Sequence, residues 1–256
     1  MALFLSALEA RPSTLRRKLA AITVMHRAAG HESPTDHGMV RATFAGILRE
    51  RGVAPRPKTA LLVDELRAAL ATCGERHIDV RDRALVLVGF AGALRRSELV
   101  GLDVQDVRLE EGEGLVLRLR RSKTNQEGEL EEVAVQYGSD PQTCPVRALQ
   151  AWLATSAIVD GPLFRAVDRA GRIGGGRLTA RIVGERVKKI GARSGLDPHS
   201  YAAHSLRSGF ATSAARANKS EAAIMRQGRW KSIPVARRYI RAGSRWHDHA
   251  GAGIGL

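Results

Sequence analysis

Apolar residues in the first 52 positions recur at the three- and four-residue spacing of amphipathic helices. The pattern predicts one helix over Thr14–Ala29 and a second over about Thr35–Arg51, which together form a hairpin. The pair offers little apolar surface, so by itself it predicts only a marginal core. The face of the first helix opposite its apolar stripe carries the basic residues Arg16, Arg17 and Lys18.

A proline-containing stretch, GVAPRPK at 52–58, separates this pair from the rest of the chain. Pro55 and Pro57 break helices and favour extended backbone, which is typical of a linker. We therefore expect a small helical unit over 1–52, a linker over 53–58 and a larger domain over 59–256.

The larger domain contains several stretches with helical patterning. They predict helices over 59–70, 79–90, 144–157 and 179–193. The second of these, Asp79–Phe90, is strongly apolar, which predicts a buried helix. Pro145 stands at a first-turn position, where its missing N–H costs nothing. Ser97 and Glu98 suit the opening of a further short helix.

Two stretches alternate apolar and polar residues with the two-residue period of a β-strand. Gly114–Arg121 places three leucines on one face, and Glu131–Val135 is a second alternating run. The residues between them, SKTNQEGE, are typical of a turn. The pattern predicts a β-hairpin with Lys123 near its tip.

Weaker patterns complete the domain. Leu163-Phe164 suggests a short third strand, and the glycine-rich stretch 171–178 predicts a flexible loop. Its glycines do not indicate a nucleotide site, because no strand–turn–helix unit with a downstream acid surrounds them. We expect a mainly α fold with a small antiparallel β-sheet, an α+β class. The order of elements does not alternate as βαβα, which argues against a Rossmann sheet.

The composition adds a large positive charge to this picture. The 256 residues include 41 Lys and Arg against 26 Asp and Glu, a formal net charge of +15. Such an excess points to a polyanionic partner, most often nucleic acid, with solubility or a compositional bias as the alternative. Cys73 and Cys144 are the only cysteines, which fits a reducing cytosol. We recognise no signal peptide and no apolar run of membrane-spanning length.

The stretch 204–239 gathers side chains suited to phosphate chemistry. His204 and Arg207 lie three residues apart and share one face of a helix. Trp230 follows them, and Tyr239 comes next. The tyrosine stands among three arginines, Arg237, Arg238 and Arg241.

Two residues upstream complete a candidate phosphate site. Arg95 precedes the short helix, and Lys123 stands on the hairpin. Guanidinium groups bind phosphate oxygens in a bidentate manner and stay charged. Two arginines, a histidine and a lysine would stabilise a pentavalent phosphorane without a metal. A tyrosine phenol has an ordinary pKa of about 10, so it needs a base or nearby cations to attack at neutral pH.

Each candidate also has an ordinary structural interpretation: a helix-surface arginine, a solvated lysine, a capping or core histidine and a core tryptophan. Two other tyrosines compete with Tyr239. Tyr137 ends a strand, where packing is the usual role, and Tyr201 is near His204 in sequence. His247 and His249 lack a third spaced ligand, so no metal site is expected.

In their order and spacing, these motifs resemble the tyrosine recombinase, or phage-type integrase, family, and in particular its Cre-like members. The resemblance covers about 58–240. The family's first box matches Arg95-Arg96-Ser97-Glu98-Leu99, and its hairpin lysine matches Lys123. Its H-x-x-R box matches His204-Ser205-Leu206-Arg207. Its His-or-Trp position matches Trp230, and its nucleophile matches Tyr239.

The resemblance implies a site-specific DNA recombinase that cleaves and rejoins strands by transesterification. Tyr239 would attack the scissile phosphate, forming a 3′-phosphotyrosyl bond and freeing a 5′-hydroxyl. Arg95 and Arg207 would clamp the nonbridging oxygens, and Lys123 would protonate the leaving 5′ oxygen. The energy kept in the phosphotyrosine implies that rejoining needs no ATP, cofactor or metal.

The same resemblance gives roles to three further residues. His204 would act as a general base or a phosphate ligand, and Trp230 would donate a hydrogen bond through its indole N–H. Glu98 would position its neighbours. Arg96 stands where the family usually has an apolar residue, which an exposed face would tolerate.

The resemblance also implies the partners. They are double-stranded DNA at a specific site and, on that DNA, a homotetramer formed by a protein that is a monomer or weak oligomer when free. It makes 1–52 a partial DNA-binding domain and 59–256 the catalytic domain with a C-terminal tail. Candidate DNA contacts are basic residues along the chain: Arg16, Arg17, Lys18, Arg56, Lys58, Arg121, Arg237, Arg238 and Arg241.

The two ends of the chain raise alternatives. Only about two helices are expected before the linker, fewer than in the family's usual bundle, which indicates a truncated chain or a reduced bundle. In the tail, Trp246, Ile254 and Leu256 either dock in cis or on a neighbouring protomer, or belong to a disordered end. The competing functions are a DNA-binding integrase remnant or regulator, and relaxation of DNA of the type IB topoisomerase kind.

Overall fold

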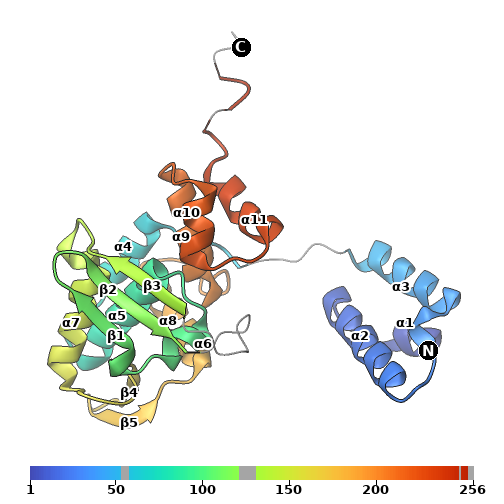
Figure 1. The fold of residues 1–256 in the computed structure, drawn as a ribbon, viewed down its shortest axis with the longest axis horizontal. Helices are drawn as coiled ribbons and strands as arrows, with labels where there is room; N and C mark the ends of the chain where they lie inside the picture. The colour runs from blue at the N-terminus through green and yellow to red at the C-terminus, as the bar shows by residue number, and fades with distance from the viewer. Residues whose placement is uncertain (53–57, 121–130, 248, 253–256) are drawn as a thin grey trace. The chain divides into compact units, whose positions relative to one another are not determined.

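The computed structural model describes residues 1–52, 58–120, 131–247 and 249–252. The chain divides into two compact units, Met1–Pro57 and Lys58–Leu256 (Figure 1). Helices predominate and the strands form small antiparallel sheets, which confirms the predicted α+β class. Among the described residues, no helix is both long enough and apolar enough to cross a membrane.

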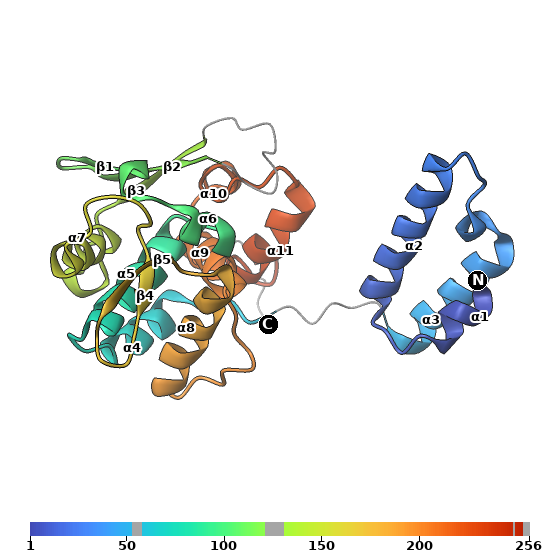
Figure 2. The ribbon, with the colours of Figure 1, turned by 90° about the horizontal axis from the view of Figure 1, so that it is seen from below.

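In its described residues, 1–52, the first unit has three α-helices and one 3-10 turn around a small core. They are α1 (Ala2–Ala7), α2 (Pro12–Ala28), η1 (Pro34–Asp36) and α3 (Gly38–Arg51). Leu5 of α1 is fully buried with Leu15, Val40 and Ile47. The two predicted helices are confirmed as α2 and α3, but the expectation of only two is wrong. Six residues are too few to reveal a helical period, although α1 packs directly on α3 (Figure 2).

The second unit carries a three-stranded antiparallel sheet. Its strands are β1 (Val107–Glu110), β2 (Gly114–Leu119) and β3 (Glu131–Gln136), in that order. Leu117 of β2 pairs with Val133 of β3, which confirms the predicted hairpin. Its tip, with Arg121 and Lys123, lies outside the described residues. The four residues of β1 were not predicted, because so short a run establishes no alternation.

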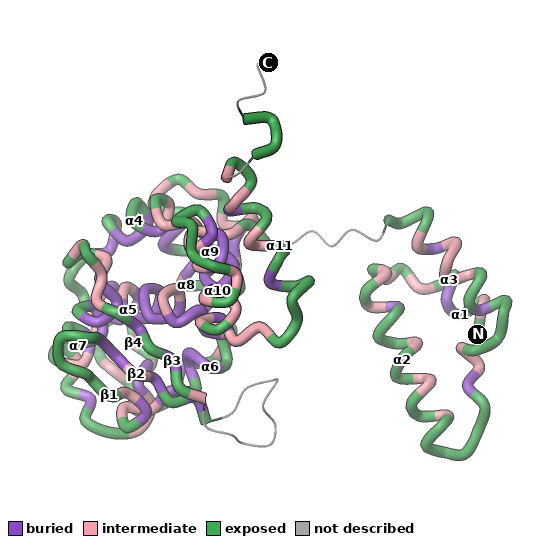
Figure 3. Tube along the Cα trace, turned by 45° about the horizontal axis from the view of Figure 1, so that its top comes forward, coloured by how far each residue is buried: buried purple, intermediate pink, exposed green. Residues whose placement is uncertain are grey.

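The helices beside this sheet are α4 (Val63–Ala71), α5 (His77–Ala91), α6 (Arg96–Gly101), α7 (Pro145–Ser156) and α8 (Ala180–Arg193). Of these, α5 and α7 pack against β3, α6 and α8 pack on α5, and α4 packs on α8. The predicted buried helix is confirmed as α5, which is mostly purple in Figure 3 and packs against α7. A Cβ on Gly89 of α5 would lie 2.8 Å from Cδ2 of Leu99, so glycine allows α6 to approach α5 closely. This packing fixes the position of α6, the helix that begins next to Arg95.

A second, two-stranded sheet corrects two expectations. It pairs β4 (Arg165–Val167) with β5 (Ile173–Arg177) in antiparallel fashion. The stretch predicted as a flexible loop over 171–178 therefore contains a strand, since paired backbone needs no side-chain pattern. Leu163 and Phe164 are not a strand. Both are fully buried in succession, whereas strand residues alternate in direction.

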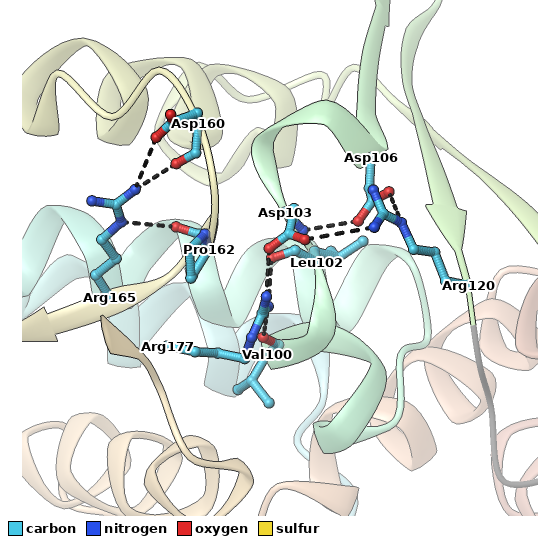
Figure 4. Close-up of polar contacts among 9 residues, drawn as sticks. All are labelled: Val100, Leu102, Asp103, Asp106, Arg120, Asp160, Pro162, Arg165 and Arg177. Atoms are coloured by element: carbon cyan, nitrogen blue, oxygen red, sulfur yellow. Dashed lines mark hydrogen bonds and ion pairs between the residues drawn. The ribbon is translucent and has the colours of Figure 1, made fainter. Parts of the chain in front are cut away.

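Polar contacts fix the end of α6 to these sheets (Figure 4). Arg177 of β5 donates to the carbonyl oxygens of Val100 (2.7 Å) and Leu102 (3.1 Å) and pairs with Asp103. Asp106 in turn accepts from the Asp103 backbone N–H at 3.0 Å. The helix that begins next to Arg95 is therefore held at its far end by Arg177, Asp103 and Asp106.

The C-terminal part of the second unit forms its own small core. It comprises α9 (His204–Arg216), α10 (Glu221–Gly228) and α11 (Ile233–Gly243). Ala211, Ala215 and Ile224 are buried there, with Tyr239 partly buried against them. A Cβ on Gly243 would lie 2.3 Å from the Thr212 carbonyl oxygen, so glycine lets α11 lie directly on α9. That contact brings two distant parts of the sequence to one place.

Candidate active site

Tyr239 and His204 meet across the contact between α11 and α9. The phenol oxygen of Tyr239 lies 2.9 Å from Nε2 of His204, and their ring centroids are 5.9 Å apart. His204 is the first residue of α9 and is exposed, whereas Tyr239 is half-buried. The tyrosine hydroxyl therefore has a base within hydrogen-bonding distance at the protein surface.

The surroundings of His204 favour its neutral form. Desolvation of the imidazole, followed by the positive charges of Arg207 and Arg95, lowers the pKa of His204 below its ordinary value. A neutral imidazole can accept a proton from the tyrosine through Nε2. The surrounding arginines thus favour the protonation state in which His204 acts as a base.

Arg207 lies one turn further along α9 and is buried, with 2% of its surface exposed. Its Nη1 donates to the Ala93 carbonyl and its Nη2 donates to the Gly228 carbonyl. Its Cζ atom lies 4.4 Å from the ring centroid of Trp230, a cation–π contact. Burial, with the charges of Arg95 and Arg229, lowers the pKa of Arg207 to about 10, so it remains a cation at neutral pH.

Trp230 contacts both Arg207 and Tyr239. Its ring centroid lies 6.0 Å from that of Tyr239, and the side chain is half-buried in the small C-terminal core. A Cβ on Gly228 would lie 1.7 Å from Cζ3 of Trp230, so only glycine leaves room for the indole. The structure gives Trp230 a packing role, whatever its indole N–H does with a ligand.

Glu98 organises the other arginine of the site. Its Oε2 accepts from the Arg95 backbone N–H at 2.8 Å, and its Oε1 pairs with Nη1 of Arg95. The Glu98 carboxylate is fully buried and also pairs with Arg229 at 2.7 Å. Burial acts to raise the pKa of Glu98, but the charge of Arg229 and the hydrogen bonds from Arg95 outweigh it and hold that pKa below its ordinary value.

These residues therefore gather a tyrosine, a histidine and oriented guanidinium groups in one cationic site. Among known proteins, the profile of the phage integrase family matches residues 59–245, most of the second unit. The chain belongs to the phage integrase family.

Two curated relatives of this integrase match it over nearly its whole length. It is 39% identical to the integrase/recombinase XerD homolog of Selenomonas ruminantium, over 94% of this chain and 72% of the relative. It is 25% identical to the Cre recombinase of Escherichia phage P1, over 93% of this chain and 73% of that protein. The resemblance to tyrosine recombinases expected from the motifs is confirmed.

Solved structures share the fold of this integrase at low sequence identity. The Tn1549 transposon integrase in complex with transposon right-end DNA superposes with a TM-score of 0.65 at 14% identity, over 93% of this chain and 78% of that one. The XerH site-specific recombinase bound to a palindromic difH substrate gives 0.59 at 16% identity, over 93% of this chain and 70% of that one.

The structure brings six of the predicted site residues of the integrase together. Arg95, Glu98, His204, Arg207, Trp230 and Tyr239 converge, whereas Lys123, Arg121 and Arg56 lie outside the described residues. Arg96 is exposed, the setting expected to tolerate an arginine at this position of the first box. In the tail, Trp246 is 78% exposed, and Ile254 and Leu256 lie outside the described residues.

Most of the predicted DNA contacts are exposed. Arg238 and Arg241 project from α11, and Arg237 beside them pairs with Glu221 at 3.0 Å. Lys58 donates to the carbonyl of His199. In the first unit, Arg17 and Lys18 are exposed, and the guanidinium of Arg16 lies 5.9 Å from the Phe44 ring centroid. Their contact with DNA stays a prediction.

The competing tyrosines and histidines take structural places. The hydroxyl of Tyr201 donates to Glu65 at 3.1 Å, and burial together with that carboxylate raises the pKa of Tyr201. Tyr137 packs against the main core. Across the described ranges, no group of three or more metal-binding side chains forms around His247, His249 or elsewhere.

Sequence reasoning missed Arg229. Its side chain is 9% exposed and pairs with Glu98, although it stands in a run of basic residues that suggests a solvated surface. The sequence signal that could have revealed the inward direction of Arg229 is its position in a Gly-Arg-Trp turn after a helix, since a residue just past a helix end can turn back toward the core.

Proposed function

We propose that this integrase cleaves and rejoins double-stranded DNA at a specific site, with Tyr239 as the nucleophile. The observation that carries the proposal is the 2.9 Å contact between the Tyr239 hydroxyl and Nε2 of His204, beside the buried cation Arg207. A phenol next to a neutral imidazole and fixed positive charge is suited to attack a phosphodiester.

The proposed step exchanges one phosphoester bond for another. The Tyr239 oxygen forms a bond to phosphorus while the bond from phosphorus to the 5′ oxygen breaks, which leaves a 3′-phosphotyrosyl link. The phenol proton passes to Nε2 of His204. The 5′ oxygen takes a proton from Lys123 as general acid, and rejoining reverses each transfer. Because the number of phosphoester bonds is unchanged, the cycle needs no ATP.

Two arginines stabilise the phosphorane in this proposal. The two carbonyls that hold Arg207 and the stacked Trp230 fix its guanidinium before the substrate arrives, so little reorganisation is needed. Glu98 similarly holds Arg95 at the start of α6. Together they place positive charge where negative charge develops on the nonbridging oxygens.

The DNA partner follows from the same site and from the net charge of +15. We propose that the first unit is a DNA-binding domain, that Arg238 and Arg241 contact the backbone near Tyr239, and that the active assembly on DNA is a homotetramer. Solved structures with the same fold include a recombinase and an integrase bound to DNA, and a dimer of lambda integrase on a core site. A cytoplasmic, nucleoid-associated location belongs to the same proposal.

A covalent-trapping assay tests the proposal. A DNA site selected by its binding to the protein is nicked a few nucleotides 3′ of the scissile phosphate, so that the short fragment carrying the freed 5′-hydroxyl diffuses away after cleavage. Wild-type protein should then give a covalent adduct on a denaturing gel, and Tyr239→Phe should give none. Tyr201→Phe is the matched control and should retain the adduct.

The outcomes separate the alternatives. Tight binding without an adduct would favour a DNA-binding regulator, and relaxation of a plasmid that lacks the selected site would favour a type IB topoisomerase activity. Family membership favours neither of these alternatives.

A further inference from the structure

Arg229 ends α10 in a backbone conformation that is unusual for an arginine. It is the C-cap residue of the helix, with φ 52° and ψ 44°, in the left-handed region. Glycine adopts this region freely, whereas residues with a Cβ adopt it seldom. The position nevertheless holds a long side chain that is 9% exposed. Its contacts therefore offer a reason for the arginine.

The Arg229 guanidinium reaches four separate segments. Its Nη2 pairs with Oε2 of Glu98 at 2.7 Å. Its Nη1 donates to the carbonyl oxygens of Gly92 (3.3 Å) and Gln227 (3.1 Å). Its Nε lies 3.6 Å from Oε2 of Glu131, the first residue of β3. One side chain thus links α6, the end of α5, its own turn and the sheet.

The end of α5 is anchored by the same group of residues. Three successive carbonyls there accept hydrogen bonds from the α9–α10 region: those of Ala91, Gly92 and Ala93 accept from Gln227 (3.0 Å), Arg229 (3.3 Å) and Arg207, respectively. The backbone that leads into Arg95 is therefore attached to the turn whose Gly228 carbonyl holds Arg207.

Charge balance points the same way. The fully buried carboxylate of Glu98 is shared between two cations, Arg95 and Arg229. Without Arg229, Arg95 would be the remaining partner in that pairing and would be held on it more tightly, because an unpaired buried charge is costly. In the proposed reaction, however, Arg95 must remain available to bind a phosphate. Because the Arg229 guanidinium is permanently paired with Glu98, Arg95 stays available.

We infer that Arg229 is a positioning residue for the reaction, which sets Arg95 in place relative to Arg207 through Glu98 and the carbonyls at the end of α5. The inference rests on the proposed function. Arg229 acts through its neighbours and needs no contact with DNA.

Three substitutions distinguish the contribution of the Arg229 guanidinium from that of the left-handed backbone conformation at this position. Arg229→Met removes the polar contacts but keeps a Cβ in the left-handed region, Arg229→Gly also relieves that conformation, and Arg229→Lys keeps the charge without the planar fork. For each variant, one measures the DNA dissociation constant, the melting temperature and the single-turnover rate of adduct formation on the nicked site.

The Met and Gly variants should bind DNA with wild-type affinity and form the adduct about 100-fold more slowly, the scale expected when a reacting group is slightly misplaced. The Gly variant should melt above the Met variant yet cleave no faster, which a purely structural role would not produce. The Lys variant should recover part of the rate, because it still balances Glu98.

Two comparisons make the test specific. Arg193→Met breaks a comparable pair with buried Asp79 (2.9 Å) far from the site chemistry, so it should lower the melting temperature without slowing cleavage. Adding Arg229→Met to Arg95→Ala should cause no further loss of rate, because both changes act on the same interaction.

Adduct formation by Arg229→Gly at the wild-type rate would overturn the inference, as would a double variant that loses the full product of the two single effects. A wild-type protein that forms no adduct would instead overturn the proposed function, so the two failures are distinguishable.

Discussion

The guanidinium of Arg207 lies against the indole of Trp230, with Cζ 4.4 Å from the ring centroid. Arg207 is buried, and its Nη atoms donate to the carbonyls of Ala93 and Gly228. The tryptophan therefore covers one face of the guanidinium, and it also contacts Tyr239. Packing and proposed chemistry depend on the same ring.

Removing that ring should affect both stability and cleavage. Trp230→Ala is expected to lower the free energy of unfolding by about 2 to 3 kcal/mol, through lost packing and the lost cation–π contact, and to slow adduct formation. Urea denaturation and the trapping assay measure the two effects. Trp246→Ala is the matched control, because Trp246 is 78% exposed, and it should leave stability unchanged. Equal stability of Trp230→Ala and wild type would contradict the packing described.

A single methyl group at Gly228 should have a comparable effect. Its Cβ would lie 1.7 Å from Cζ3 of Trp230, so Gly228→Ala must displace the indole. We expect a loss of about 1 to 3 kcal/mol in unfolding free energy and a slower cleavage step. Gly101→Ala, where a Cβ meets nothing within 4 Å, provides the control. A Gly228→Ala variant that cleaves like wild type would show that the indole position is unimportant.

The pH dependence of cleavage should report His204. Desolvation and the charges of Arg207 and Arg95 lower the pKa of His204 below 6.5, so the neutral base persists to lower pH than an ordinary histidine allows. The apparent second-order rate of adduct formation, measured at subsaturating DNA, should therefore fall only below pH 6.5, as the imidazole gains its proton. His204→Gln should be slow and should lack that acidic limb. A wild-type rate that already falls above pH 6.5 would contradict this assignment.

Arg237 offers a test of the DNA-facing side of α11. It is exposed and pairs with Glu221 at 3.0 Å, and a solvent-exposed ion pair of this kind contributes little to stability. If it contacts a phosphate, Arg237→Gln should weaken DNA binding and reduce the slope of log affinity against log salt by about 1, with little change in melting temperature. Arg67→Gln removes another exposed arginine, from α4, and should leave the slope unchanged. Equal slopes for Arg237→Gln and wild type would remove Arg237 from the interface.

The main features of the fold and the site could be predicted from the sequence because they depend on local patterns. The three-residue spacing of His204 and Arg207 puts both on one helix, and the alternation of β2 and β3 predicts their hairpin. The features that could not be predicted depend on tertiary contacts. Glycine-rich β5 forms a strand through its pairing with β4, and α1 is too short to show a period.

Arg229 illustrates the same limit within the site. Because Arg229 lies in a run of basic residues, the sequence suggests a solvated side chain. The side chain points inward because of the left-handed turn after α10. Which arginine of a basic run pairs with a buried glutamate is decided by that turn and by the place of Glu98 on another helix. Neither is visible in spacing alone.

The central claim is that Tyr239 becomes covalently attached to DNA, and the most direct measurement is to locate the attachment. The trapped adduct is digested with nuclease and trypsin, and the peptide bearing a nucleotide is identified by mass spectrometry. Arg238 and Arg241 bracket the expected product, so the nucleotide should reside on the tripeptide Tyr239-Ile240-Arg241. A nucleotide on a peptide containing Tyr137 or Tyr201, or on a serine, would contradict the account.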